Sequence, residues 1–119
     1  MEIYFKSKKM QKQCSEDRTM QKAFGRKMCK RLKQRLMELS AADNLADISH
    51  LPPPRCHELR NRKGVFSVDL EQPYRLLFEA ANEPIPRNAS GGVELSLVTE
   101  IMVIEIADTH DPKAQRRNK

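Results

Sequence analysis

Two of the three histidines in this 119-residue chain stand beside residues that would suit acid–base chemistry. His57 lies in "RCHELRNRKG", and His110 follows the apolar run "MVIEI" and Asp108. Histidine can take up and release a proton near neutral pH, because its unperturbed pKa is about 6.5. Two such groups could cut RNA through its own 2′-hydroxyl, one acting as base and one as acid. Asp108 could orient the His110 ring; the plainer alternatives are surface histidines and a strand-end cap.

Cations that could stabilise a reacting phosphate follow His57. Arg75, in "PYRLLF", is the first candidate, since a guanidinium is permanently charged and can hold a phosphate with two parallel hydrogen bonds. Arg60, Arg62 and Lys63 precede Gly64 in a predicted turn and suit secondary phosphate contacts. The alternatives are an edge-strand cation for Arg75 and a merely solvated basic turn for the others.

Metal, disulfide and thiol chemistry find little support. No Asp, Glu and His residues stand at metal-ligand spacing, so we expect a mechanism without metal or cofactor. Cys14, Cys29 and Cys56 are odd in number and form no CxxC pair, which indicates a reducing, cytoplasmic location. Cys56 adjoins His57, but neighbouring strand residues point to opposite faces, so a Cys–His nucleophile is not expected. His50 belongs to no catalytic pattern.

The charge of the chain favours a polyanionic partner. Lysine and arginine number 22 against 16 acidic residues, a net charge of +6, although a merely soluble basic protein has the same composition. One predicted helix face carries like charges almost without acids until Glu38, so it forgoes stabilising pairs, and we expect it to hold RNA without reading sequence. Its cations are Lys22, Arg26, Lys27, Lys30, Arg31, Lys33 and Arg35. No signal-like or membrane-spanning run is present, so no membrane partner is expected.

The elements that must position these residues can be read from hydrophobic periodicity. "EIYFK" predicts an opening strand, and a helix follows that begins near Lys8 and is interrupted at "CSED". Its main part carries apolar residues at four-residue spacing, which predicts a single core-facing stripe. The stripe consists of Met20, Phe24, Met28, Leu32 and Leu36.

A hairpin and a central strand are predicted in the second half. "GVFSVDL" and "YRLLFEA" alternate with period two and predict an antiparallel pair. The alternation separates Val65, Ser67 and Asp69 from Phe66, Val68 and Leu70. A loop at 82–92 then precedes a central strand at 101–106. The order predicts an α+β single domain, one N-terminal helical layer on an antiparallel sheet.

Four segments in this order resemble the RelE/ParE toxin superfamily, most closely its HigB-like branch, the plasmid maintenance system killer family. They are "FGRKMCKRLKQRLMELSAADNLADI", "RCHELRNRKGVFSVDL", "PYRLLFE" and "MVIEIADTHD", within residues 1 to 111. The resemblance implies a toxin domain at 1–110, with a curved antiparallel sheet, and leaves 111–119 as a disordered basic tail. It also implies a ribosome-dependent mRNA endonuclease, held inactive by a helix-turn-helix antitoxin, with His57, Arg75, His110 and Asp108 at its centre.

The chain departs from this family pattern at two places. Thr109 stands where the family commonly has tyrosine, so a ring that could stack on a base is absent there. The loop from Asn82 to Gly92 is longer than in compact members. Two alternatives stay open: a ParE-like toxin that inhibits DNA gyrase by binding, and a non-catalytic basic module that binds nucleic acid or the ribosome.

Overall fold

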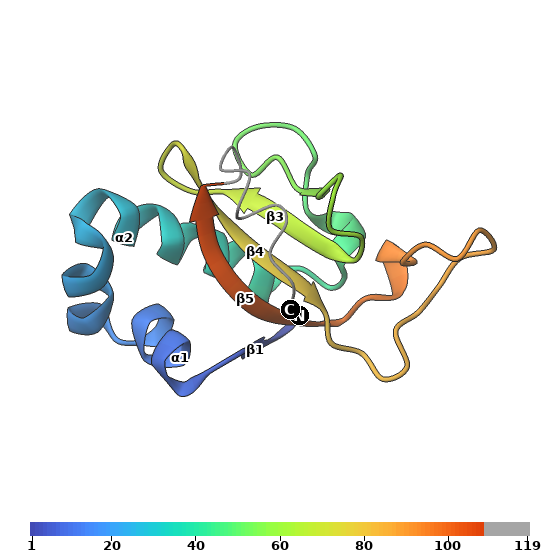
Figure 1. Ribbon diagram of the computed structural model, residues 1–119, viewed down its shortest axis with the longest axis horizontal. Helices are drawn as coiled ribbons and strands as arrows, with labels where there is room; N and C mark the ends of the chain where they lie inside the picture. The colour runs from blue at the N-terminus through green and yellow to red at the C-terminus, as the bar shows by residue number, and fades with distance from the viewer. Residues whose placement is uncertain (109–119) are drawn as a thin grey trace.

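The computed structural model describes residues 1–108, so Thr109, His110 and the predicted tail at 111–119 lie outside the described residues. Two helices pack against one sheet of five strands (Figure 1). The elements are β1 (Glu2–Phe5), α1 (Lys8–Ser15), α2 (Asp17–Ala41), the 3-10 turn η1 (Leu45–Asp47), β2 (His57–Glu58), β3 (Val65–Asp69), β4 (Tyr74–Ala80), the 3-10 turn η2 (Leu95–Leu97) and β5 (Glu100–Asp108). The predicted α+β class is confirmed.

The sheet is mixed, which corrects the prediction of an antiparallel one. Its strand order is β1-β5-β4-β3-β2. The pairs β2–β3, β3–β4 and β4–β5 are antiparallel. β1 instead pairs parallel to β5, with Ile3 opposite Ile101. The sequence pattern could not reveal this direction, because β1 meets β5 only after the chain has passed through both helices and three strands.

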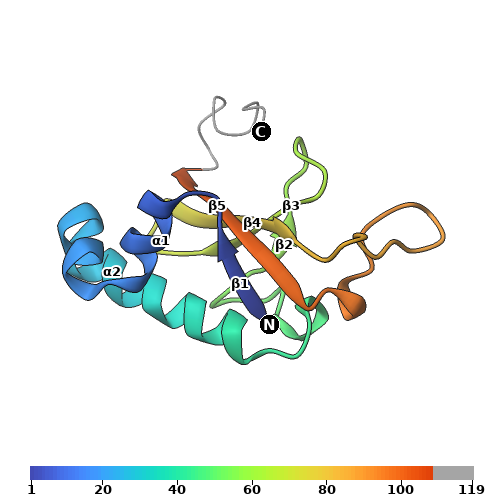
Figure 2. The same ribbon diagram turned by 90° about the horizontal axis from the view of Figure 1, so that it is seen from below.

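The predicted apolar stripe faces the core but does not run along one straight helix. Met20, Met28 and Leu32 are buried in a cluster with Phe66 and Phe78 of the sheet. At Gly25 the backbone leaves the helical region, with φ 81° and ψ 169°. Glycine takes this conformation readily because it has no Cβ. The helix therefore changes direction there, and its longer part runs beneath the sheet (Figure 2).

The hairpin of β3 and β4 has the predicted alternation. Phe66, Val68 and Leu70 lie in the main core with α2, whereas Val65 belongs to a second, smaller cluster with Leu77. Ser67, Asp69 and Arg75 are also buried, at 0%, 7% and 7% exposure. The hairpin thus has an apolar face toward α2 and an opposite face that buries polar groups, which we call the polar face. No helix within residues 1–108 is long and apolar enough to cross a bilayer.

Candidate active site

His57 and Arg75 are brought together across the hairpin and its neighbouring strand. Ser67 of β3 lies opposite His57 of β2, and Asp69 lies opposite Arg75 of β4. His57 and Arg75 are therefore offset by two residues, about 7 Å, along the strand direction, and β3 lies between their two strands. Arg75 NH1 lies 2.6 Å from His57 Nε2. Of the predicted catalytic residues, these two are in direct contact.

The contact with Arg75 corresponds to one tautomer of His57. A guanidinium nitrogen can only donate, so Nε2 is the acceptor in this contact, and the ring proton is then on Nδ1. Nδ1 lies 3.2 Å from the carbonyl oxygen of Glu58 and donates to it in this tautomer. The ring is exposed. The site therefore places Nε2 of an exposed imidazole against a cation.

Arg75 also contacts Asp69 and Arg55. Arg75 Nε is 2.9 Å from Asp69 Oδ1, an ion pair without hydrogen-bond alignment, and its NH2 donates to the carbonyl oxygen of Arg55 at 2.8 Å. Burial lowers the pKa of Arg75, while the Asp69 carboxylate opposes this shift. Arginine nevertheless stays charged at neutral pH. Arg75 is thus a buried cation whose outer nitrogen reaches His57.

Arg55 shares the same carboxylate. Its Nε donates to Asp69 Oδ2 at 2.6 Å and its NH2 to Oδ1 at 3.3 Å. This hydrogen bonding, with the charge of Asp69, raises the pKa of Arg55. Arg55, Asp69 and Arg75 therefore carry a net charge of about +1 beside His57, which suits an anion. We call these four residues the His–Arg cluster.

Sequence reasoning missed Arg55 and Asp69. The alternation did place Asp69 on the same face as Ser67, and Asp69 lies directly across from Arg75 in the hairpin. A carboxylate opposite an arginine in a predicted hairpin was therefore a usable signal. Arg55 gave none, because its position depends on the proline turn before it and on a backbone φ of 45°.

The other predicted residues of the turn and the last strand lie elsewhere. Arg62 is 8% exposed and its NH1 is 3.2 Å from Glu105 Oε1, so it is committed to an ion pair within the protein. Arg60 and Lys63 are exposed. Asp108 pairs with Tyr74, and by strand alternation its side chain belongs to the face opposite that of Arg75. His110 is outside the described residues.

Arg35 does not lie on the exposed helix face predicted for it. Its side chain is 3% exposed, Nε donates to the carbonyl oxygen of Asp69 at 2.7 Å, and NH2 donates to that of Pro53 at 3.1 Å. The spacing contained this signal, because Arg35 is three residues after Leu32 and four before Leu39, both in the core. Arg35 therefore links α2 to the end of β3 by a hydrogen bond to Asp69.

The remaining cations of this face are available to a partner. Lys22, Arg26, Lys27, Lys30 and Lys33 are exposed, and Arg31 is half-buried. Lys33 is joined to Asp17, with 2.5 Å between Nζ and Oδ1, so part of its charge is already compensated. We call Arg26, Lys27, Lys30 and Arg31 the basic helix face; Lys22 lies before the change of direction at Gly25.

Cys56 does not act with His57, as the strand argument predicted. Its side chain is buried in the main core, whereas the His57 ring is exposed. Burial raises the pKa of the Cys56 thiol to about 11, against a smaller opposite effect of Arg75. A thiol in this environment stays protonated near neutral pH and is a poor nucleophile.

Residues 1–108 thus define a single-domain α+β protein, with two helices on a mixed five-stranded sheet and a histidine–arginine cluster on its polar face. No protein-family model, curated protein or solved structure matches the chain. The resemblance to HigB-like toxins therefore stays a prediction that rests on the sequence motifs. Within the described part of the chain, no group of three or more His, Cys, Asp or Glu side chains could hold a metal ion.

Proposed function

We propose that this chain is a HigB-like toxin of a type II toxin–antitoxin system, which cleaves mRNA on the ribosome by attack of the 2′-hydroxyl. The observation that supports this most is the contact of Nε2 of exposed His57 with the permanent cation of Arg75, at 2.6 Å. A base and a phosphate-binding cation in contact are the two groups that the reaction needs first. The proposal includes a helix-turn-helix antitoxin as partner and the cytoplasm as location.

Substrate binding would free the base. In the unbound site, His57 Nε2 is occupied by the Arg75 donor. A phosphate oxygen is a stronger acceptor for a guanidinium than a neutral imidazole, because the hydrogen bond is charge-assisted on both sides. An RNA phosphate would therefore draw Arg75 NH1 toward itself and leave Nε2 able to accept a proton. Binding of the phosphate to Arg75 and release of His57 Nε2 would thus occur in the same step.

The reaction then follows from the positions of these groups. His57 Nε2 removes the proton of the 2′-hydroxyl, and the oxygen forms a bond to the adjacent phosphorus. Arg75 and Arg55 stabilise the added negative charge. The bond to the 5′-oxygen breaks, which yields a 2′,3′-cyclic phosphate and a 5′-hydroxyl. The departing oxygen needs a proton from a general acid, for which His110 is the candidate from the sequence.

Inducible expression with primer extension on a reporter mRNA tests this proposal. The wild type is compared with His57→Ala/His110→Ala, and His50→Ala is the control, since His50 is an exposed histidine outside the cluster. We expect new 5′ ends inside translated codons for the wild type and for His50→Ala. They should be absent in the double variant and when translation initiation is blocked.

Two other outcomes would reject the nuclease. Growth arrest with intact mRNA would favour the gyrase-inhibiting alternative, because a binding inhibitor needs no titrating group. Neither arrest nor cleavage would favour a non-catalytic module that binds the ribosome or nucleic acid. The exposed cations of the basic helix face are a specific observation in favour of this last alternative, since phosphate contacts need no catalysis.

A further inference from the structure

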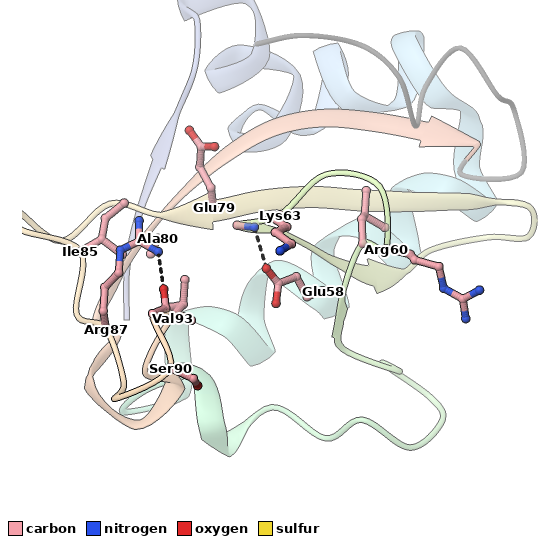
Figure 3. Close-up of a pocket in the computed structure, with 13 residues that line it drawn as sticks. Glu58, Arg60, Lys63, Glu79, Ala80, Ile85, Arg87, Ser90 and Val93 are labelled. Carbon is pink, nitrogen blue, oxygen red and sulfur yellow. Dashed lines mark hydrogen bonds between the residues drawn. The ribbon is translucent and has the colours of Figure 1, made fainter.

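A second concave site includes Glu58, which follows His57 in β2 and points to the opposite face of that strand. A cleft of about 790 Å³ opens between the turn that joins β2 to β3 and the long loop that follows β4. Figure 3 shows Ile85, Arg87 and Val93 on one wall and Glu58 and Lys63 on the other. Clefts of roughly 300–1,000 Å³ bind small molecules and cofactors, so this one has room for a nucleotide.

The polar groups of this cleft are oriented by hydrogen bonds. Glu58 Oε2 accepts from the Gly64 amide at 2.6 Å, and Arg87 NH1 donates to the carbonyl oxygen of Gly91 at 3.2 Å (Figure 3). The loop that carries Arg87 is itself braced, because Asn88 Oδ1 accepts from the amides of Ser90 and Gly92 at 3.0 Å each. The carboxylate and the guanidinium therefore face the cleft in defined positions.

The lining suits the three parts of a nucleotide. Ile85 and Val93 offer apolar surface to the flat face of a base. Lys63 and Arg87 are exposed cations that suit a phosphate. Glu58 can only accept hydrogen bonds, so it selects bases by the donors on their edges. An apolar wall, an acceptor and two cations together are typical of a site that reads one base and holds its phosphate.

The register of the sheet sets the distance from this cleft to the His–Arg cluster. His57 is level with Ser67 and Leu77, whereas the cleft residues Glu79 and Ala80 lie two and three residues further along β4. That offset is about 7–10 Å along the strand, and the two strand spacings from β2 to β4 add about 10 Å across the sheet, which gives a separation of roughly 12–14 Å. Stacked nucleotides advance about 3.4 Å each, so this separation corresponds to roughly three or four nucleotides of a strand.

We propose that this cleft binds one nucleotide of the RNA that passes His57, and that Glu58 makes it prefer guanine over uracil. Guanine presents two adjacent N–H donors, which match the oxygens of a carboxylate. Uracil presents one N–H between two carbonyl oxygens, which the carboxylate repels. The identification of the ligand as RNA rests on the proposed nuclease function. The base preference rests on Glu58 and would follow from the cleft alone.

Titration of the ¹⁵N-labelled full chain with guanosine and uridine monophosphates tests the proposal. The amide signals of Gly64, Gly91 and Gly92 report on the cleft, which these glycines line. We expect guanosine monophosphate to shift them and to bind roughly tenfold more tightly than the uridine nucleotide, as a paired contact to a base edge discriminates. Arg87→Ala should weaken both nucleotides.

Glu58→Gln isolates the base preference. The glutamine oxygen can still accept from Gly64, so the turn is kept, but an amide both donates and accepts and should bring the two affinities close together. Glu83→Gln is the matched control, because Glu83 is an exposed glutamate on the loop that follows β4 and does not line the cleft. Equal binding of both nucleotides to the wild type, or an unchanged ratio in Glu58→Gln, would overturn the proposal.

This readout separates the cleft from the nuclease, since it needs neither ribosome nor cleavage. A chain that binds guanosine monophosphate at these glycines but leaves mRNA intact in cells would reject the nuclease and support the cleft. A chain that cuts mRNA while the three glycine signals stay unshifted would reject the cleft alone.

Discussion

Asp69→Asn should destabilise the protein because it removes the one carboxylate between two arginines. The Asp69 side chain is 9% exposed and that of Arg75 8%, so the Asp69–Arg75 pair is almost fully buried. Removing one partner of a buried ion pair typically costs about 3–5 kcal/mol, since the other charge stays buried without compensation. Arg55 is 45% exposed, and its share is at most about 1 kcal/mol because water screens it.

The expected loss is close to 3 kcal/mol, the lower end of that range. The asparagine oxygen can still accept from Arg55, and the backbone carbonyl of residue 69 can still accept from Arg35. For a chain of this size, 3 kcal/mol corresponds to a fall in Tm of about 10–15 °C. Urea denaturation followed by circular dichroism measures it, with unchanged slope as a check on two-state behaviour.

Asp43→Asn provides the comparison, since Asp43 is an exposed carboxylate. Equal stabilities of the two variants, each within about 0.5 kcal/mol of the wild type, would refute the reasoning. That result would mean that Asp69 contributes no more than a solvated surface charge. The position of Arg75 against His57 would then need another explanation.

Three further predictions concern the helix, the thiols and the basic helix face. Arg35→Met should cost about 2–4 kcal/mol in urea denaturation, because the buried carbonyl oxygen of Asp69 and the partly buried one of Pro53 lose their donor. Burial raises the pKa of Cys14 and Cys56 to about 11 each, so the unfolded thiols ionise first as pH rises. Each thiol should contribute about 2–3 kcal/mol to the free energy of unfolding below pH 9, and this contribution should be lost toward pH 11, as urea denaturation across that range can measure. Lys27→Gln/Lys30→Gln should reduce the slope of log affinity against log salt for double-stranded RNA by about 2, roughly one per lost phosphate contact.

Matched variants give these predictions their controls. Arg31→Met removes a partly exposed arginine from the same helix and should cost much less than Arg35→Met. Replacing Cys14 and Cys56 by alanine should flatten the dependence of stability on pH between pH 9 and 11. A dependence as steep as that of the wild type would contradict the role given to these two thiols. Lys33→Gln should change the salt slope less than its neighbours, because Asp17 already compensates part of the Lys33 charge.

Local periodicity was enough to predict the parts of the fold that depend on neighbouring residues. The alternation at 65–70 gave the two faces of the hairpin, and the four-residue spacing from Met20 gave the core side of α2. The contact of His57 with Arg75 was not derivable from spacing, because it depends on the register of three strands. The resemblance alone suggested that these two residues act together.

Two features that the sequence pattern did not predict depend on contacts between residues distant in the chain. Arg35 belongs to a run of cations, and its burial follows only from carbonyl acceptors at Pro53 and Asp69, which are distant in sequence. The parallel pairing of β1 with β5 likewise depends on how the chain crosses the helical layer. Gly25 was inside a continuous apolar pattern, and the pattern concealed the change of direction that glycine permits.

The place of β5 in the sheet has a consequence for how the protein is made. β5 lies between β1 and β4, so the first strand to be synthesised has no partner until residues 100–108 have been added. Such pairing between distant segments slows folding, since the intervening chain must be closed into a loop before any contact forms. A nascent chain that stops before Glu100 therefore leaves the edge of β4 uncovered and exposed to chaperones, proteases and other strands. Premature termination before Glu100 should thus yield protein that is degraded or aggregated instead of a shortened protein with partial activity.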